Sequence, residues 1–152
     1  MRSLLEMRGA GVVLQQWDTS CGAAALATVL TYGFADPVSE QAAAQAMLRR
    51  TDPLRVKVRG GFSLLDMKRF AESRGYAAEG YRNLSLGELL ARAPAIVPIA
   101  EYGSPHFVVV RGVRNGEVDI ADPAFGNRRM PVERFLEVWQ QGIGFAIRRP
   151  GP

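Results

Sequence analysis

Helix signals and strand signals occupy different parts of this sequence, and their separation is the feature that most constrains the fold. Alanine- and leucine-rich segments with helix-capping residues predict helices over residues 21–32, 40–50 and 64–74. Residues 51–61 are expected to form a loop or a short ribbon, because valine alternates with charged residues from Arg55 to Arg59. Strand patterns follow at 76–81, 95–100, 107–110, 117–121, 128–130 and 142–149, the last as an edge strand, with short helices at 85–91 and 131–139. This order predicts an α+β fold, with N-terminal helices packed on a C-terminal antiparallel sheet.

The length and composition fit one globular domain over residues 1–152. A chain of this length buries about 70% of its unfolded surface. A composition of 47% hydrophobic and 22% charged residues is typical of globular domains rather than of disordered or membrane-inserted chains. The net charge is +4, but the Lys and Arg residues are dispersed and form no basic face with interleaved aromatics. We therefore expect no nucleic-acid partner and no stable membrane insertion.

Cys21 is the only cysteine, which excludes an internal disulfide and makes it the one candidate thiol nucleophile. Thr19 and Ser20 are helix-capping residue types, so Cys21 is expected at a helix start. Unpaired backbone N–H groups and the helix dipole favour a thiolate there, and the thiolate is the form that attacks a carbonyl carbon. Gly22 has no side chain and is expected to let a substrate backbone approach the sulfur. The alternative is a buried cysteine that acts only as a small hydrophobic residue.

His106, the only histidine, is the one imidazole that can serve such a thiol as a general base. It follows a predicted turn at 103–105 and precedes an apolar, β-branched run, so it is expected at the mouth of a strand. Asp122 ends the next predicted strand, which an Asn115-Gly116 turn joins to the first. Two paired strands of this length place His106 and Asp122 near the same edge, where a carboxylate can orient the imidazole. Taken separately, His106 could be a solvent-facing strand end and Asp122 a turn residue before Pro123.

A glutamine shortly before the cysteine is the fourth candidate site residue. Acyl transfer creates an oxyanion, and a side-chain amide beside the nucleophile stabilises it by roughly 10²–10³ in rate. Gln15 and Gln16 both precede Cys21 and are chemically equivalent. The chemistry alone does not choose between them.

Several stretches carry a resemblance to a known family: Gln15, the run Asp18-Thr19-Ser20-Cys21-Gly22-Ala23-Ala24-Ala25-Leu26, the run His106-Phe107-Val108-Val109-Val110, and Asp122-Pro123 followed by Gly126. Together they resemble the C39 peptidases, papain-like cysteine proteases known for removing leader peptides from bacteriocin precursors. The resemblance spans essentially the whole chain and implies a papain-like fold. In that family the oxyanion glutamine lies six residues before the cysteine, as Gln15 does here, and the aspartate follows the histidine by the same interval as here.

The resemblance implies a cysteine endopeptidase in which Cys21 attacks the peptide carbonyl, His106 carries the proton, Asp122 orients His106 and Gln15 holds the oxyanion. It also implies cleavage after Gly-Gly in a precursor or leader peptide, with no cofactor. One cysteine with one histidine cannot build an ordinary structural zinc site, so no metal cluster is expected. Two alternatives stay open. One is a non-catalytic C39-like domain that docks an export substrate, and the other is a papain-like transamidase.

Many family members are N-terminal domains of membrane exporters driven by ATP. This chain shows no membrane span and no phosphate-binding loop, so it resembles the stand-alone branch. Residues 2–15 resemble periplasmic members associated with the export of functional amyloid subunits. The resemblance implies a peptide or protein substrate of an export or amyloid secretion system and a periplasmic location, although residues 1–14 show no signal peptide. A single thiol suits the cytoplasm equally.

Overall fold

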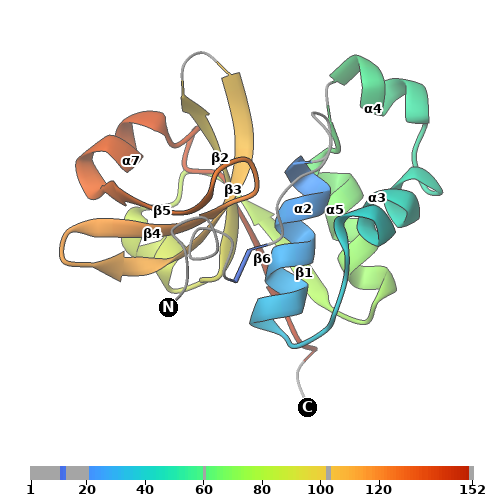
Figure 1. The fold of residues 1–152 in the computed structure, drawn as a ribbon, viewed down its shortest axis with the longest axis horizontal. Coiled ribbons are helices and arrows are strands. Elements are labelled where there is room, and N and C mark those ends of the chain that lie inside the picture. The colour runs from blue at the N-terminus through green and yellow to red at the C-terminus, as the bar shows by residue number, and fades with distance from the viewer. Residues whose placement is uncertain (1–10, 13–20, 60, 102–103, 151–152) are drawn as a thin grey trace, which may run out of the picture.

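The computed structural model describes residues 11–12, 21–59, 61–101 and 104–150. One group of helices lies against one face of a six-stranded sheet, and two short helices lie against the other face (Figure 1). The first group comprises α2 (Cys21–Thr28), α3 (Glu40–Leu48), α4 (Pro53–Arg59) and α5 (Leu64–Ser73), and the second comprises α6 (Leu86–Leu90) and α7 (Val132–Val138). The α+β class predicted from the sequence is confirmed. Among the described residues, no helix combines the length and the apolar content that crossing a membrane requires.

The sheet is antiparallel throughout, with strands in the order β1-β6-β2-β3-β4-β5. Its strands are β1 (Ala77–Tyr81), β2 (Ala95–Glu101), β3 (Ser104–Arg114), β4 (Glu117–Asp122), β5 (Gly126–Pro131) and β6 (Gly144–Arg148). The prediction that residues 142–149 form an edge strand is wrong. β6 lies between β1 and β2, and its Ala146 is paired with Glu79 on one side and Ala95 on the other. The edges of the sheet are β1 and β5.

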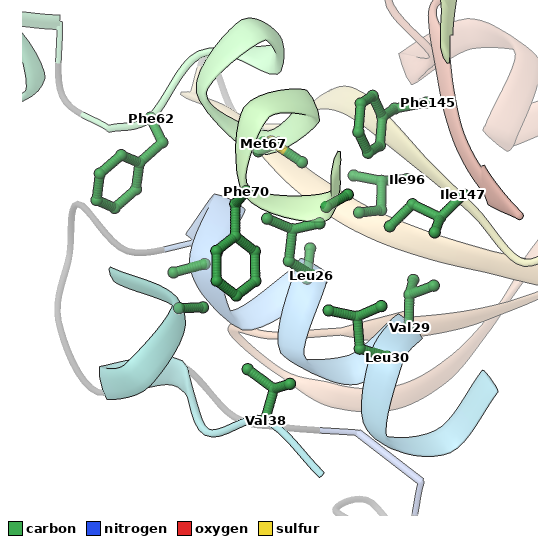
Figure 2. Close-up of a cluster of buried hydrophobic side chains, with 14 of the residues drawn as sticks. Leu26, Val29, Leu30, Val38, Phe62, Met67, Phe70, Ile96, Phe145 and Ile147 are labelled. Atoms are coloured by element: carbon green, nitrogen blue, oxygen red, sulfur yellow. The ribbon is translucent and has the colours of Figure 1, made fainter. Parts of the chain in front are cut away.

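Two hydrophobic cores lie on the opposite faces of the sheet, because successive side chains of a strand point to opposite sides. On the helical face, Leu26 of α2 and Leu30 of the turn that follows it pack with Phe70 of α5 and with Ile96 and Phe145 of the sheet (Figure 2). The other core joins apolar residues of the central strands to α6 and α7: Leu89, Val97, Ile99, Val108, Val110, Ile120 and Phe135. The first core holds α2 in place, so it fixes where the cysteine-bearing helix meets the sheet.

Two of the predicted helices, α3 and α5, begin after the serines expected to cap them, whereas Thr19 and Ser20 lie outside the described residues. The side chains of Ser39 and Ser63 accept hydrogen bonds from backbone amides in the first turns of α3 and α5, which satisfies donors that a helix start leaves unpaired. After α5, Gly75 adopts a positive φ of 90°, the usual glycine stop of a helix. The cysteine helix continues beyond α2 as a π-helical turn, Val29–Gly33.

The prediction of a loop or ribbon over residues 51–61 is wrong, because Pro53–Arg59 form helix α4. Asp52 Oδ1 accepts a hydrogen bond from the Leu54 amide at 2.9 Å, so Asp52 caps this helix. Pro53 occupies the first helical position, where its missing N–H loses nothing and its fixed φ suits the helix. The Asp-Pro start outweighs the alternation of valine and charged residues that suggested a ribbon.

Strand β3 is longer than predicted and begins before His106. Ser104 and Pro105 belong to the strand rather than to a turn, and Pro105 is paired with Ala100 of β2. His106 is therefore the third residue of β3. The predicted turn between β3 and β4 is confirmed, because Asn115 and Gly116 have positive φ angles of 54° and 75°.

Candidate active site

Four charged or ionisable residues gather at one end of the sheet, one from each of four neighbouring strands. The strand register and the two-residue side-chain period place them on one face, next to apolar residues of the second core. They are Glu101 of β2, His106 of β3, Asp122 of β4 and Arg128 of β5. Polar groups at the end of an apolar face can be held in fixed positions while they remain accessible from outside.

His106 and Asp122 contact each other, as the predicted hairpin requires. His106 Nε2 lies 3.3 Å from Asp122 Oδ2. The side chain of Asp122 is fully buried, whereas that of His106 is 17% exposed. This geometry can orient the imidazole and stabilise its protonated form. The catalytic roles of the two residues stay predictions.

Asp122 is held by more than His106. Its Oδ1 accepts hydrogen bonds from the backbone amides of Ala124 at 2.8 Å and Phe125 at 3.3 Å. Its Oδ2 accepts a hydrogen bond from Arg128 Nη1 at 3.0 Å. Burial, the largest single influence, raises the pKa of the Asp122 carboxyl, but the hydrogen bonds from His106, Ala124 and Arg128 outweigh it and hold that pKa below its ordinary value. Asp122 is therefore a carboxylate at neutral pH.

Arg128 joins Asp122 to Glu101. Its Nη1 and Nη2 donate to Glu101 Oε1 and Oε2, both at 2.9 Å, and Nη1 also donates to Asp122. The side chain of Glu101 is 8% exposed and that of Arg128 is 27% exposed, so this fork-shaped ion pair is partly shielded from water. The hydrogen bonds to Glu101 and, to a smaller extent, to Asp122 raise the pKa of the Arg128 guanidinium above its ordinary value.

Phe125 closes one side of the His106 and Asp122 pair. Its ring meets the His106 ring edge to face, with centroids 6.5 Å apart and an interplanar angle of 74°. The Arg128 guanidinium carbon lies 5.8 Å from the centroid of the Phe125 ring. Phe125 is 53% exposed, so an aromatic surface borders the imidazole on its solvent side.

Cys21 is the first residue of α2, as predicted, while its side chain lies outside the described part of the structure. Gln15 and Gln16 lie outside the described residues. The start of α2 does reach the histidine strand, because a Cβ added to Gly22 would stand 3.7 Å from Cδ2 of Phe107, the neighbour of His106.

Gly22 itself is buried and faces the core, with the Met67 sulfur 3.3 Å from the position of an added Cβ. Gly22 therefore has a packing role between α2, α5 and β3, and the expectation that it makes room for a substrate stays a prediction.

One group of potential metal ligands occurs among the described residues, although none was expected. Ligand atoms of Glu101, His106 and Asp122 all lie within 4.8 Å of one another. The guanidinium of Arg128 already bonds both carboxylates and supplies the positive charge between them. The arrangement is accounted for by Arg128 and supports no metal site.

Sequence reasoning missed Glu101, Arg128 and Phe125. Arg128 was grouped with dispersed surface charge, although it alternates with buried Met130 in β5 and so had to point to the same face. Glu101 continues the alternation of β2 in the same way after buried Ile99. In both strands, the signal in the sequence is a charged residue that continues the alternating series of buried, core-facing side chains. No sequence signal placed Phe125 against His106.

Comparison with known proteins identifies the family. Residues 10–149 match the Peptidase C39 family. A protein of Pseudomonas aeruginosa named probable functional amyloid protease FapD is 43% identical over 147 residues, which cover 97% of this chain and 64% of that protein. This chain therefore spans less than two thirds of the length of that relative.

Solved structures share the fold. The peptidase domain of Streptococcus ComA, a bifunctional ABC transporter, superposes with a TM-score of 0.75 at 23% identity, over 91% of this chain and 98% of that domain. A double glycine motif protease from an AMS/PCAT transporter, solved with its leader peptide, gives a TM-score of 0.66 at 28% identity, over 91% of each chain. With this fold and a family match over nearly its whole length, the chain belongs to the peptidase C39 family.

Proposed function

We propose that this domain is a cysteine endopeptidase that cleaves a precursor or leader peptide. In this proposal Cys21 is the nucleophile, His106 the general base and acid, Asp122 the residue that orients His106, and Gln15 an oxyanion donor. Its main support is the contact between His106 and the buried carboxylate of Asp122. The strand that carries His106, β3, packs against the start of the Cys21 helix. Membership of a peptidase family supports the same chemistry.

In this proposal each ring nitrogen of His106 has its own task. His106 Nε2 faces Asp122, so Nδ1 is the nitrogen that would exchange a proton with Cys21. The thiolate attacks the peptide carbonyl, and the new oxyanion is held by backbone N–H groups at the helix start and by Gln15. Collapse of this intermediate breaks the C–N bond, and the leaving amine takes the proton from His106. A water molecule, deprotonated by His106, then attacks the thioester and releases the carboxylic acid and the thiol.

The proposed substrate carries Gly-Gly immediately before the scissile bond. The support is similarity to a double glycine motif protease solved with its leader peptide. A pocket that admits only hydrogen side chains rejects larger residues by steric overlap. This discriminates more strongly than a missing methylene, which is worth about 1–3 kcal/mol. We further propose a partner within an export or amyloid secretion system and a periplasmic location.

Two other functions would use the same fold. A docking domain would bind the peptide without cutting it, and a transamidase would transfer the acyl group from Cys21 to an amine instead of water. The well-formed contact between His106 and Asp122 favours catalysis over docking, because binding alone does not require a buried carboxylate behind an imidazole. The products distinguish hydrolysis from transamidation.

The test is intact-mass spectrometry of a Gly-Gly peptide incubated with the wild type, Cys21→Ala and His106→Ala at matched concentration. Asp119→Asn is the control variant, because Asp119 lies on β4 with Asp122 but has a side chain that is 45% exposed. Hydrolysis by the wild type and by Asp119→Asn gives two fragments whose masses sum to the peptide plus water. Replacing either glycine by valine sharply lowers kcat/KM. A fragment joined to an added amine indicates a transamidase, and binding without cleavage across several Gly-Gly peptides indicates docking.

A further inference from the structure

Asp122 also contacts a second charged pair, Arg128 and Glu101, which the proposed mechanism does not use. Asp122 Oδ2 is shared between two donors, His106 Nε2 at 3.3 Å and Arg128 Nη1 at 3.0 Å. A cation bonded to the oxygen that faces the imidazole competes for the negative charge that would stabilise the imidazolium. Arg128 therefore fixes the position of the Asp122 carboxylate. Unless its own charge is neutralised, it also weakens the stabilisation that this carboxylate gives the His106 imidazolium.

Glu101 supplies that neutralisation. It holds both terminal nitrogens of Arg128 at 2.9 Å in a part-buried pair, with Glu101 8% and Arg128 27% exposed, where the attraction is screened less than at the surface. Followed along their hydrogen bonds, the four groups alternate in charge, in the order Glu101, Arg128, Asp122 and protonated His106. Within the described residues, Glu101, Asp122 and Arg128 are the charged groups that lie beside His106 from β2, β4 and β5.

We propose that Arg128 is a positioning residue that locks the Asp122 carboxylate against His106, and that Glu101 neutralises Arg128 so that Asp122 keeps its charge for the imidazolium. This proposal rests on the proposed function, because it concerns the orientation of the general base. Arg128 acts on His106 through Asp122, and Glu101 acts through Arg128 and also directly, since its carboxylate lies within 4.8 Å of a His106 ring nitrogen. Because both residues act on the general base, we expect them to alter kcat rather than substrate affinity.

The experiment follows the only imidazole of the chain by NMR as the pH is varied. It is done in the Cys21→Ser background, so that the thiol does not titrate with the histidine. Removing the negative charge in Glu101→Gln leaves Arg128 unneutralised and moves the His106 midpoint to lower pH. Removing the positive charge in Arg128→Met moves the midpoint to higher pH. The double variant returns it toward the parent value, because the two charges are removed together.

Opposite movements distinguish this role from a purely structural one. Local unfolding would move both single variants in the same direction, toward the midpoint of an exposed histidine. Arg129→Met is the matched control, because Arg129 is the next residue on β5 and is exposed on the opposite face. Unmoved midpoints, or movement of both single variants in one direction, overturn the proposal. If Arg128→Met does not fold, Arg128→Lys replaces it; it keeps the charge without the fork and must leave the midpoint nearly unchanged.

Activity provides the second readout, in the protein with Cys21 intact. Loss of an outer partner of a catalytic group lowers activity by roughly 10–100-fold, so we expect kcat to fall by about that factor in Glu101→Gln and Arg128→Lys, with KM retained. A fall in kcat/KM that comes from KM alone contradicts the positioning role. The NMR titration needs no cleavage, so it tests the electrostatic roles of Arg128 and Glu101 even if the peptidase assay fails.

Discussion

Replacing Asp122 by asparagine tests both the site and its role in folding, because every acceptor position of this carboxylate is occupied. Oδ1 accepts from the Ala124 and Phe125 amides, and Oδ2 accepts from His106 and Arg128. In Asp122→Asn, one of the two carboxylate oxygens is replaced by an NH₂ group, which then faces two hydrogen-bond donors. The amide oxygen fits best against the two backbone amides, which leaves the NH₂ group facing His106 and Arg128.

The free energy lost follows from these contacts. Breaking a buried charged pair by removing one partner costs about 3–5 kcal/mol. Glu101 still holds Arg128, which lowers the expected loss to about 2–4 kcal/mol of unfolding free energy, within the range of one or two buried unsatisfied groups. The same change removes the carboxylate that fixes the imidazole tautomer, and we expect kcat to fall by roughly 10⁴ while the fold is retained.

The loss of stability also has a pH signature. The pKa of Asp122 is lower in the folded protein than its ordinary value, so its stabilising contribution is fully present above the unfolded pKa near 4 and is lost as pH falls through the folded pKa. The stability gap between the wild type and Asp122→Asn is therefore largest at neutral pH and narrows in acid.

Urea unfolding at pH 7 and at acid pH measures the gap, and peptide cleavage measures kcat. Asp119→Asn serves as control on the same strand. Its partly exposed pair with Arg111 at 2.9 Å is worth only about 0–1 kcal/mol. Equal losses of stability in the two variants, or an Asp122→Asn enzyme with wild-type kcat, refute the reasoning.

Three further predictions follow from the chain. Iodoacetamide labels Cys21 in the native protein faster near neutral pH than it labels a free thiol, because the helix start favours thiolate; labelling only after unfolding contradicts the nucleophile assignment. Gln15→Ala lowers kcat by roughly 10²–10³ and Gln16→Ala far less, and equal losses rule out the six-residue spacing. Gly142→Ala destabilises the fold, because Gly142 has φ +60° and an added Cβ would lie 2.8 Å from the Leu84 amide nitrogen; we expect a lower urea midpoint by a loss of about 1–3 kcal/mol, and an unchanged midpoint contradicts the strain.

Sequence patterns alone determined the fold class, most elements and the contact between His106 and Asp122. These follow from local rules. Capping serines mark the starts of α3 and α5, and two-residue alternation marks the strands. A turn with two positive φ angles returns β4 beside β3, and this brings Asp122 back to His106. A hairpin is the one tertiary contact that neighbouring residues can dictate.

Only the tertiary structure decided where β6 lies and what surrounds Asp122. β6 pairs with β1 and β2, which are distant in the sequence, and no local pattern shows whether a buried strand has one neighbour or two. Glu101 and Arg128 read as ordinary surface charge until β2 and β5 are placed on the two sides of the β3 and β4 hairpin. Their ion pair depends on side chains that meet across several strands. The two-residue alternation shows which face each side chain lies on, but which charges meet across the strands is set by the packing of the whole sheet.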